Sequence, residues 1–294
     1  MTNRARVLVV YFSQTGRTRD VLGEFLRPLR ESAEVELDEV RLEPVQPYPY
    51  PWPATQVLAL FPEVVLEKPI ELKPISIDRS RRYDLVVLGC QVWFLSSSLP
   101  VVSFLNSQDA AVLAGTPVVP VLTFRKAWSS GLRCVEKHVE RLGGTLAGKV
   151  VVKAQDRSGF ALLKALRKDQ PEDGKDYHFN PADLERVAAM GRQVVAALTG
   201  GTGAPLTSLP PESAQVLPPR RARQEMTIEE RLIEDFEAMQ KQRYLRAAGF
   251  IVKLSGPQTL WRRVLTACLA PFFMPPIYWK VPFLIASRLV GGRR

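Results

Sequence analysis

A short hydroxyl-rich segment near the amino terminus has the residue types of an anion-binding loop. Its sequence, Ser-Gln-Thr-Gly-Arg-Thr at 13–18, follows the apolar run 7–12 and precedes a stretch with apolar residues at helical spacing. In such a strand–loop–helix unit the loop N–H groups and hydroxyls converge on one spot, where the helix amino terminus adds about half a positive charge. The Gly-Lys-Ser/Thr triplet of triphosphate-binding loops is absent here. The sequence predicts a phosphate site, against the alternative of an ordinary capped turn.

The candidate phosphate ligands are the six residues of this loop. They are Ser13, Gln14, Thr15, Gly16, Arg17 and Thr18.

A second candidate segment, 89–100, follows the apolar run at 84–89 and combines large rings with small residues. It contains Gln91, Val92, Trp93 and Phe94. A flat cofactor ring needs an apolar or aromatic contact and a few backbone donors at its edge, and this segment offers both. We expect the segment to lie beside the first loop. The alternative is that Trp93 and Phe94 are core residues.

A third candidate segment follows the apolar run at 117–123 and carries two cations. It begins with Thr123, Phe124, Arg125 and Lys126, and a helical pattern follows it. Positive charge at this point would stabilise an anionic reduced ring or an enolate oxygen. The alternative is that Arg125 and Lys126 are solvated surface charges.

The candidate general bases lie near residue 177. Tyr177 and His178 precede a helix and are expected on a loop after the fifth strand, from which either could approach the ring edge. Together with Arg125 they form the candidate catalytic set, with capping or packing as the alternative. The other histidine, His138, is expected at the surface of a helix.

Apolar runs of strand length alternate with helical patterns along the first 200 residues. They predict strands at 7–12, 34–42, 84–89, 117–123 and 148–153. Such an α/β pattern favours a doubly wound, five-stranded parallel sheet with strand order 2-1-3-4-5. In that fold the ligand lies at the carboxyl ends of strands one and three, where the winding direction reverses.

Changes in composition divide the chain into three parts. We expect a binding domain at 1–201 with an insertion at 44–80, a Pro/Arg-rich linker at 202–225 and a helical, apolar extension at 226–294. Prolines alternate with aromatic residues at 47–53, which predicts either a stiff surface loop or an aromatic wall beside a pocket. Asn180 is expected to cap the last helix of the domain.

The carboxyl-terminal extension opens with a helix that places Ile228, Leu232, Ile233, Phe236 and Met239 on one side. Further on, no charged residue occurs at 264–279, but prolines interrupt the run and basic residues flank it. These features favour a lid on the domain, a dimer surface, or a peripheral membrane contact through 258–294 at the inner face of the membrane.

Charge and cysteine content narrow the class of protein. The 294 residues include 40 Lys and Arg against 30 Asp and Glu, so anionic partners are favoured. Nucleic acid is not expected, because no nucleic-acid-binding module is recognisable. The three cysteines are widely spaced, which implies neither a disulfide framework nor a metal site. With no secretion signal expected, the sequence favours the cytoplasm.

The loop at 13–18 and its setting resemble the FMN phosphate loop of flavodoxin-like proteins, and this resemblance covers about two thirds of the chain. The sequence Tyr-Phe-Ser-Gln-Thr-Gly at 11–16, the proline–aromatic insertion and the long extension resemble a narrower branch. That branch is the aromatase, or dialkylresorcinol-condensing-enzyme, type of bacterial dialkylresorcinol and isopropylstilbene pathways.

The resemblance implies an FMN-dependent oxidoreductase of secondary metabolism. Its substrate would be a hydrophobic cyclohexane-1,3-dione with alkyl or aryl groups, which loses two hydrogens to become a resorcinol. One alternative is an NAD(P)H-dependent flavin or quinone reductase, and another is a non-catalytic electron carrier. The net charge of +10 argues against the carrier, because such carriers are acidic. Flavodoxin-like enzymes are often dimers, so a homodimer is a further expectation.

Overall fold

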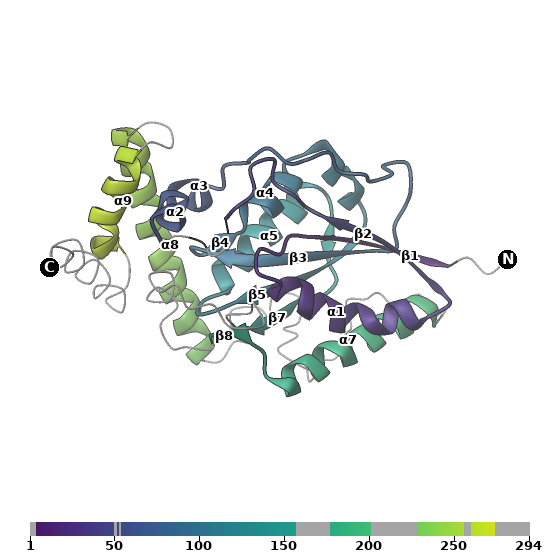
Figure 1. Cartoon of the computed structure of the whole chain (residues 1–294). Helices are drawn as coiled ribbons and strands as arrows, with labels where there is room; N and C mark the ends of the chain where they lie inside the picture. Colours follow the sequence, from purple (N-terminus) through teal and green to yellow (C-terminus); the bar gives the residue numbers. More distant parts are fainter. Residues whose placement is uncertain are drawn as a thin grey trace, which may run out of the picture.

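A parallel sheet forms the centre of the computed structural model, which describes residues 4–49, 52, 54–156, 177–200, 228–255 and 260–273. Its main strands are β1 (Ala5–Tyr11), β2 (Val35–Arg41), β3 (Leu85–Trp93), β5 (Pro117–Phe124) and β7 (Val150–Lys153). They run in the order β2-β1-β3-β5, with β7 on the far side of β5, and all these pairs are parallel (Figure 1). The predicted α/β fold with a flavodoxin-like parallel sheet is confirmed, and its predicted order 2-1-3-4-5 is matched as far as the fourth predicted strand, which is β5.

Strict alternation of buried residues in the strands supplies two apolar layers. In β1, Val7 and Val9 face one layer, and Leu8 and Val10 face the other. The first layer is closed by α1 (Arg17–Glu31) and α7 (Pro181–Thr199), and the second by α4 (Leu99–Leu105) and α5 (Ser129–Arg141). Helices on both faces make the strands nearly continuous apolar runs, as expected for a doubly wound sheet.

The fifth strand differs from the prediction because it is split. A two-residue strand, β6 (Thr145–Leu146), pairs with the start of β5, and β7 pairs with its end. Pro120 of β5 lies opposite the interruption between these two strands. Proline has no N–H to donate to a ladder, so a continuous partner strand is not supported at this point.

The third strand is longer than predicted and ends in a hairpin. Gln91, Val92 and Trp93, expected on a loop, continue β3, and Val92 and Trp93 pair with β4 (Ser96–Ser97). The two turn residues, Phe94 and Leu95, have φ angles of 45° and 63°. Such a left-handed pair suits a two-residue hairpin but is costly for residues with large side chains.

The insertion and the short elements complete the domain. The insertion contains α2 (Ala54–Ala59) and α3 (Phe61–Val65), and a 3₁₀ helix spans Gln108–Leu113. Two short strands, β8 (Gln155–Asp156) and β9 (Tyr177–His178), pair with each other, so Tyr177 and His178 lie on a strand rather than the expected loop. The Asn180 side chain accepts from the N–H of Ala182 at 3.0 Å, which confirms the predicted cap. The predicted linker at 202–225 lies outside the described residues.

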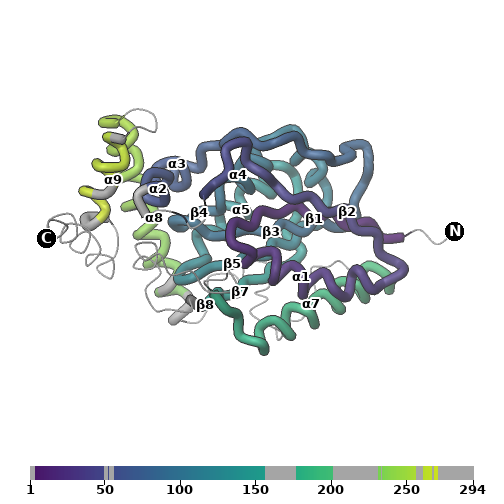
Figure 2. The backbone as a smooth tube through the Cα atoms, in the orientation of Figure 1, coloured from purple at the N-terminus to yellow at the C-terminus, as the bar shows by residue number. Residues whose placement is uncertain are grey.

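Two helices of the extension lie side by side at the end of the molecule away from the amino terminus (Figure 2). They are α8 (Ile228–Ser255) and α9 (Leu260–Phe273). A third apolar cluster joins them to the insertion and to the β3–β4 turn. Its members include Phe61, Tyr244, Ala248, Ile251 and Ala270, with Phe94 and Leu95 packed against them. Among the described helices, none combines the length and the hydrophobicity that crossing a bilayer requires.

The predicted apolar side of α8 does not face the domain. Leu232, Phe236 and Met239 are 64%, 54% and 46% exposed, whereas Glu237 and Gln240 are buried. The physical reason is that the amino end of α5 needs an acceptor. Glu237 Oε1 accepts from the N–H of Trp128 at 3.2 Å, and Oε2 accepts from the N–H of Ser130 at 2.8 Å. A carboxylate satisfies these helix-start N–H groups, and an apolar residue cannot.

A largely buried ionic cluster ties α8 to the insertion and to α5. Glu67 lies 3.5 Å from Lys241 Nζ of α8 and 3.6 Å from Nε2 of His138 on α5. Lys241 also donates to Ser96 of the β3–β4 hairpin. His138 is 7% exposed, so its predicted surface position is wrong. The His138 side chain points from α5 toward Glu67 and not toward solvent.

The same cluster brings together three groups that bind metals elsewhere. Ligand atoms of Glu67, Cys134 and His138 lie within 4.8 Å of one another. Here the Lys241 ammonium already provides the cation beside Glu67, and burial raises the pKa of the Cys134 thiol to about 12. We therefore interpret the arrangement as a structural contact, in which Glu67 ties α8 to α5 through Lys241 and His138. This contact is called the tether below.

The tether predicts a pH-dependent stability. Burial raises the pKa of the Glu67 carboxyl, but His138, Lys241 and Lys137 outweigh it and lower the pKa to about 2, from 4.5. On acidification, the Glu67 carboxylate takes up a proton in the unfolded chain before it does so in the folded protein. Its stabilisation is therefore fully present above pH 4.5 and is lost as the pH falls toward 2. We expect Glu67→Gln to lower the free energy of unfolding at neutral pH by about 2 kcal/mol.

Urea denaturation of the wild type and of Glu67→Gln at several pH values measures this effect. The difference between the two proteins should shrink on acidification. Glu71→Gln is the matched control, because Glu71 is an exposed residue of the same insertion. A difference that stays constant as the pH falls would contradict an ionic role for Glu67.

Candidate functional site

The loop between β1 and α1 has the form of an anion-binding turn. Gly16 adopts φ 87° immediately before α1, a left-handed conformation that residues with a Cβ rarely adopt. The Ser13 hydroxyl accepts from the N–H of Arg19 at 3.2 Å, so it closes the first turn of the helix. The loop thus directs the amino end of α1 toward the carboxyl edge of the sheet, where a negative charge is stabilised.

Two threonines predicted in this loop have different surroundings: Thr15 lies in the loop, whereas Thr18 lies in the first turn of α1. Thr18 is fully buried, and its hydroxyl lies 3.0 Å from that of Thr123 at the end of β5. This contact brings the first and third predicted segments together. The Thr15 hydroxyl oxygen is buried and has no hydrogen-bond partner. A buried hydroxyl without a partner costs free energy, so its presence points to a ligand that supplies the missing bond.

The Gln14 side chain fastens the insertion to the first loop. Its amide donates to the carbonyl oxygens of Tyr48 and Pro49, both at 3.2 Å. A cluster of four aromatic rings lies beside this contact, with centroids 5.0–6.1 Å apart in the pairs that touch. Its members are Phe12, Tyr48, Trp52 and Trp93. The insertion therefore places two rings against the carboxyl ends of β1 and β3.

Two polar atoms of the aromatic cluster also lack partners. They are Tyr48 Oη and Trp52 Nε1, and both are buried. Burial raises the pKa of Tyr48, so its hydroxyl stays protonated and is a donor. Ring surfaces with unsatisfied donors at their edges are suited to a flat molecule that has polar atoms on its rim.

The third segment ends β5 and leads into α5. Phe124 lies 6.4 Å from Trp128 between ring centroids, Arg125 follows it and is half-buried, and Lys126 is exposed. The two cations therefore lie at the carboxyl edge of the sheet, one residue and two residues beyond the strand. Arg125 and Lys126 thus lie where the sequence placed them, and the stabilisation of negative charge by these two residues stays a prediction.

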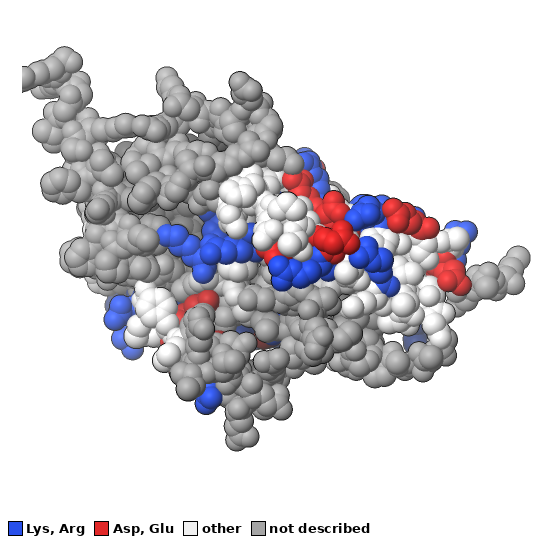
Figure 3. Space-filling model, turned by 90° about the horizontal axis from the view of Figure 1, so that it is seen from below, with Lys and Arg blue, Asp and Glu red and all other residues white. Residues whose placement is uncertain are grey.

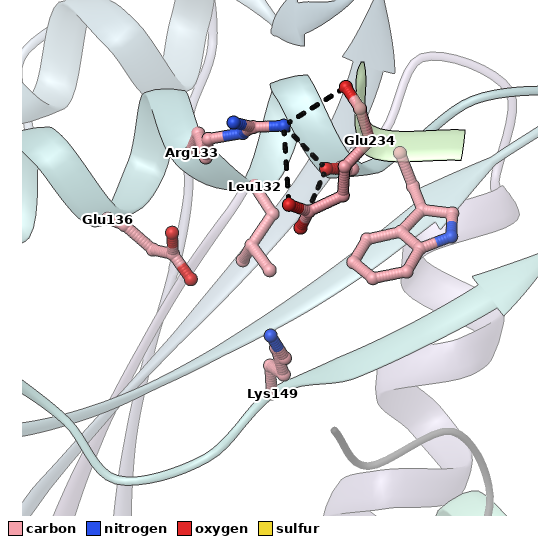
Figure 4. A pocket seen from close by; sticks show the side chains of 7 residues that line it. Leu132, Arg133, Glu136, Lys149 and Glu234 are labelled. Atoms are coloured by element: carbon pink, nitrogen blue, oxygen red, sulfur yellow. Dashed lines mark hydrogen bonds and ion pairs between the residues drawn. The ribbon is translucent and has the colours of Figure 1, made fainter. Parts of the chain in front are cut away.

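A small polar notch lies behind this segment, between α5, α8 and the start of β7 (Figure 4). Arg133 of α5 reaches Glu234 of α8, with Nη2 and Oε2 3.9 Å apart, and Lys149 Nζ lies 5.9 Å from the Trp128 ring centroid. Because the Arg133–Glu234 ion pair spans it, the notch connects α8 of the extension to α5, which follows the third segment.

The candidate bases lie on β9, and their contacts differ. The Tyr177 hydroxyl donates to Asp20 at 2.9 Å, and Arg17 lies 5.0 Å above the Tyr177 ring. Burial and Asp20 raise the pKa of Tyr177, so it remains protonated. These contacts favour a positioning role for Tyr177, because they tie β9 to the first turn of α1. Nε2 of His178 lies 2.9 Å from Oε1 of Gln155.

The structure brings most of the sequence-predicted residues to one edge of the sheet. Phe94 is the exception, because it turns away from Trp93 and packs on Phe61, with ring centroids 5.3 Å apart. Sequence reasoning missed Asp20 and Glu237, whose partners are 157 and 107 residues away along the chain. Such contacts leave no local signal.

Comparisons with solved structures give likenesses in fold. Neither a protein-family model nor a curated protein matches the chain. A Lactobacillus acidophilus flavoprotein in complex with FMN is 14% identical, covering 50% of this chain and 93% of its own, with a TM-score of 0.41. Oxidised flavodoxin 1 from Bacillus cereus is 12% identical, with 65% and 97% covered and a TM-score of 0.38.

A WrbA-like flavodoxin protein from Agrobacterium tumefaciens is similar at 11% identity, with 67% of this chain and 98% of its own covered and a TM-score of 0.38. The strand order and the loop after β1 carry the assignment of this chain to a flavodoxin-like fold.

Two glycines of α1 and its loop give a matched test of the turn. A Cβ on Gly16 would require a strained φ and would lie 2.9 Å from Tyr177 Oη, so Gly16→Ala should lower the free energy of unfolding by about 2 kcal/mol. A Cβ on Gly23 would meet nothing within 4 Å, so Gly23→Ala should raise it by about 0.5–1 kcal/mol. Chemical denaturation measures both. If the two substitutions changed the free energy of unfolding equally, the left-handed conformation of Gly16 would not be required for stability.

Proposed function

We propose that the protein binds FMN at the carboxyl edge of β1, β3 and β5 and acts as a flavin-dependent oxidoreductase. The observation that carries this proposal is the buried, partnerless hydroxyl of Thr15 in a loop that directs a helix amino terminus at the same edge. A phosphate oxygen is an acceptor of the right kind for that hydroxyl and for the N–H groups around it.

The residues present fit such a cofactor. Thr15, Gly16 and Arg17 would hold the phosphate, and the segments after β3 and β5 would border the ring system. The unsatisfied Tyr48 Oη and Trp52 Nε1 would donate to polar atoms of the ligand. Gln14 keeps this wall in place through its two bonds to the insertion.

Bound FMN would supply the chain with a two-electron acceptor. The protein residues would have three tasks. The aromatic cluster would contact an apolar substrate and exclude water. Arg125 and Lys126 would stabilise negative charge on an enolate oxygen of the substrate. His178 is the remaining candidate for the proton acceptor, because Tyr177 is held protonated against Asp20.

We further propose that the substrate is a hydrophobic cyclohexane-1,3-dione, which the enzyme dehydrogenates to a resorcinol. The sequence resemblance to the aromatase branch supports this choice, and so does the aromatic insertion beside the proposed ring site. The second candidate is an NAD(P)H-dependent flavin or quinone reductase, which would use the same cofactor site in the reducing direction.

FMN binding should depend on the Thr15 hydroxyl. We expect Thr15→Val to weaken FMN binding about tenfold or more, since a hydrogen bond to a charged group contributes about 1.5–3 kcal/mol. Quenching of flavin fluorescence on titration of the apoprotein measures this affinity.

The control is Thr199→Val, which makes the same chemical change on α7, where the hydroxyl donates to the carbonyl of Val195. That variant should bind FMN as the wild type does. If Thr15→Val binds FMN with unchanged affinity, the phosphate does not lie at this loop.

The reaction itself can be tested by anaerobic mixing. A 5-alkylcyclohexane-1,3-dione should bleach the yellow holoprotein and yield a product with resorcinol absorption, whereas NADPH should bleach it slowly. Fast bleaching by NADPH without any effect of the dione would favour the reductase and refute the aromatase.

A further inference from the structure

The excess positive charge of the chain lies entirely in one part of the extension. All 30 acidic residues lie at or before Glu237, and ten of the 40 Lys and Arg residues follow it. Residues 1–237 are therefore neutral overall, and residues 238–294 account for the net charge of +10. On much of the described surface in Figure 3, acidic and basic side chains lie next to one another.

Exposed apolar side chains concentrate in the same region. Eight large apolar residues are exposed in the described part of the chain, and all but Val45 belong to α8 or α9. On α9, Trp261 and Val264 are 59% and 46% exposed. A concentration of this kind on one pair of helices marks an interaction site rather than ordinary surface.

The two properties combine in one stripe along residues 239–254 of α8. Its six residues recur at helical spacing on the side opposite the buried Tyr244, Ala248 and Ile251. This basic–apolar stripe consists of Met239, Arg243, Arg246, Phe250, Lys253 and Leu254. All six are exposed, and Phe250 and Leu254 are each 53% exposed.

We propose that the basic–apolar stripe docks the protein on an anionic lipid bilayer, with Phe250 and Leu254 at the acyl boundary and the cations at the headgroups. Rows of large apolar residues with flanking Arg and Lys are typical of helices that lie in the membrane interface, and each added cation strengthens the attraction to acidic lipid. The neighbouring α9 adds Trp261 and Arg263 to the same end of the molecule.

Charge argues against the other occupants of the stripe. In a twofold dimer through this stripe, each copy would bring Arg243, Arg246 and Lys253 toward the same set on its partner. The chain's own segment 274–294 carries four cations and no acid, so it would be repelled as well. Among partners outside the chain, an acidic protein is the remaining competitor, and the experiment below separates it from lipid.

Vesicle flotation of the full-length protein tests the proposal. The wild type should float with vesicles that contain phosphatidylglycerol, should not float with phosphatidylcholine alone, and should be released by added salt, which screens charges beyond about 8 Å at physiological ionic strength. Arg243→Glu/Arg246→Glu should reduce binding about tenfold or more. Phe250→Ser/Leu254→Ser should also reduce it.

Arg4→Glu/Arg82→Glu is the matched control, because it makes the same change in net charge at two exposed positions outside the extension. It should float like the wild type, and circular dichroism and sedimentation velocity should show all three variants folded with the same oligomeric state. The proposal is overturned if the Arg243/Arg246 variant floats normally, if the control is equally impaired, or if the wild type does not float. Loss of a dimer in the stripe variants, without lipid binding by the wild type, would assign the stripe to self-association instead.

Discussion

The pairing of β1 with both β2 and β3 is the constraint on which the site depends. Because all three strands are parallel and the winding reverses at β1, the segments after β1 and β3 lead to opposite faces of the sheet. α1 then covers one face and α4 the other, and their starting segments diverge at a common edge. The Thr18–Thr123 contact brings the end of β5 to the same place.

The β3–β4 hairpin is one of the places where the additions to the fold connect to that edge. Trp93, on one side of its turn, packs in the aromatic cluster, while Phe94 and Leu95 pack in the apolar cluster shared by the insertion and the extension. A non-glycine residue with a left-handed backbone costs about 1–3 kcal/mol, and burial of a large side chain offsets a cost of this size. The extension therefore stabilises the turn that positions Trp93.

The main strands and the cap of α7 were predictable because their physical causes are local. A strand covered on both faces is a short apolar run, and a capping Asn acts within two residues.

The split fifth strand was not predicted because it depends on Pro120 of the neighbouring strand. The buried face of α8 was assigned to the wrong side, since a helix docks where its partner needs it, and here the amino end of α5 required the carboxylate of Glu237. The loop at 13–18 was recognisable because its residues are adjacent in the sequence. The contacts of Gln14 with Tyr48 and of Asp20 with Tyr177 were not predicted, because they join residues far apart in the chain.

The orientation of α8 also explains why the net charge of the chain says little about the proposed phosphate site at 13–18. The acidic residues of α8 lie in its first ten residues, and most of its basic residues follow, an order that complements the helix dipole. Glu237 anchors the acidic half against α5, and Lys241 is used in the tether with Glu67. The remaining cations of the second half are left facing outward beside Phe250 and Leu254. The exposed cations of this half therefore belong to a surface that helix docking creates. The proposed phosphate site would rely instead on backbone N–H groups, the Thr15 hydroxyl and a single cation, Arg17.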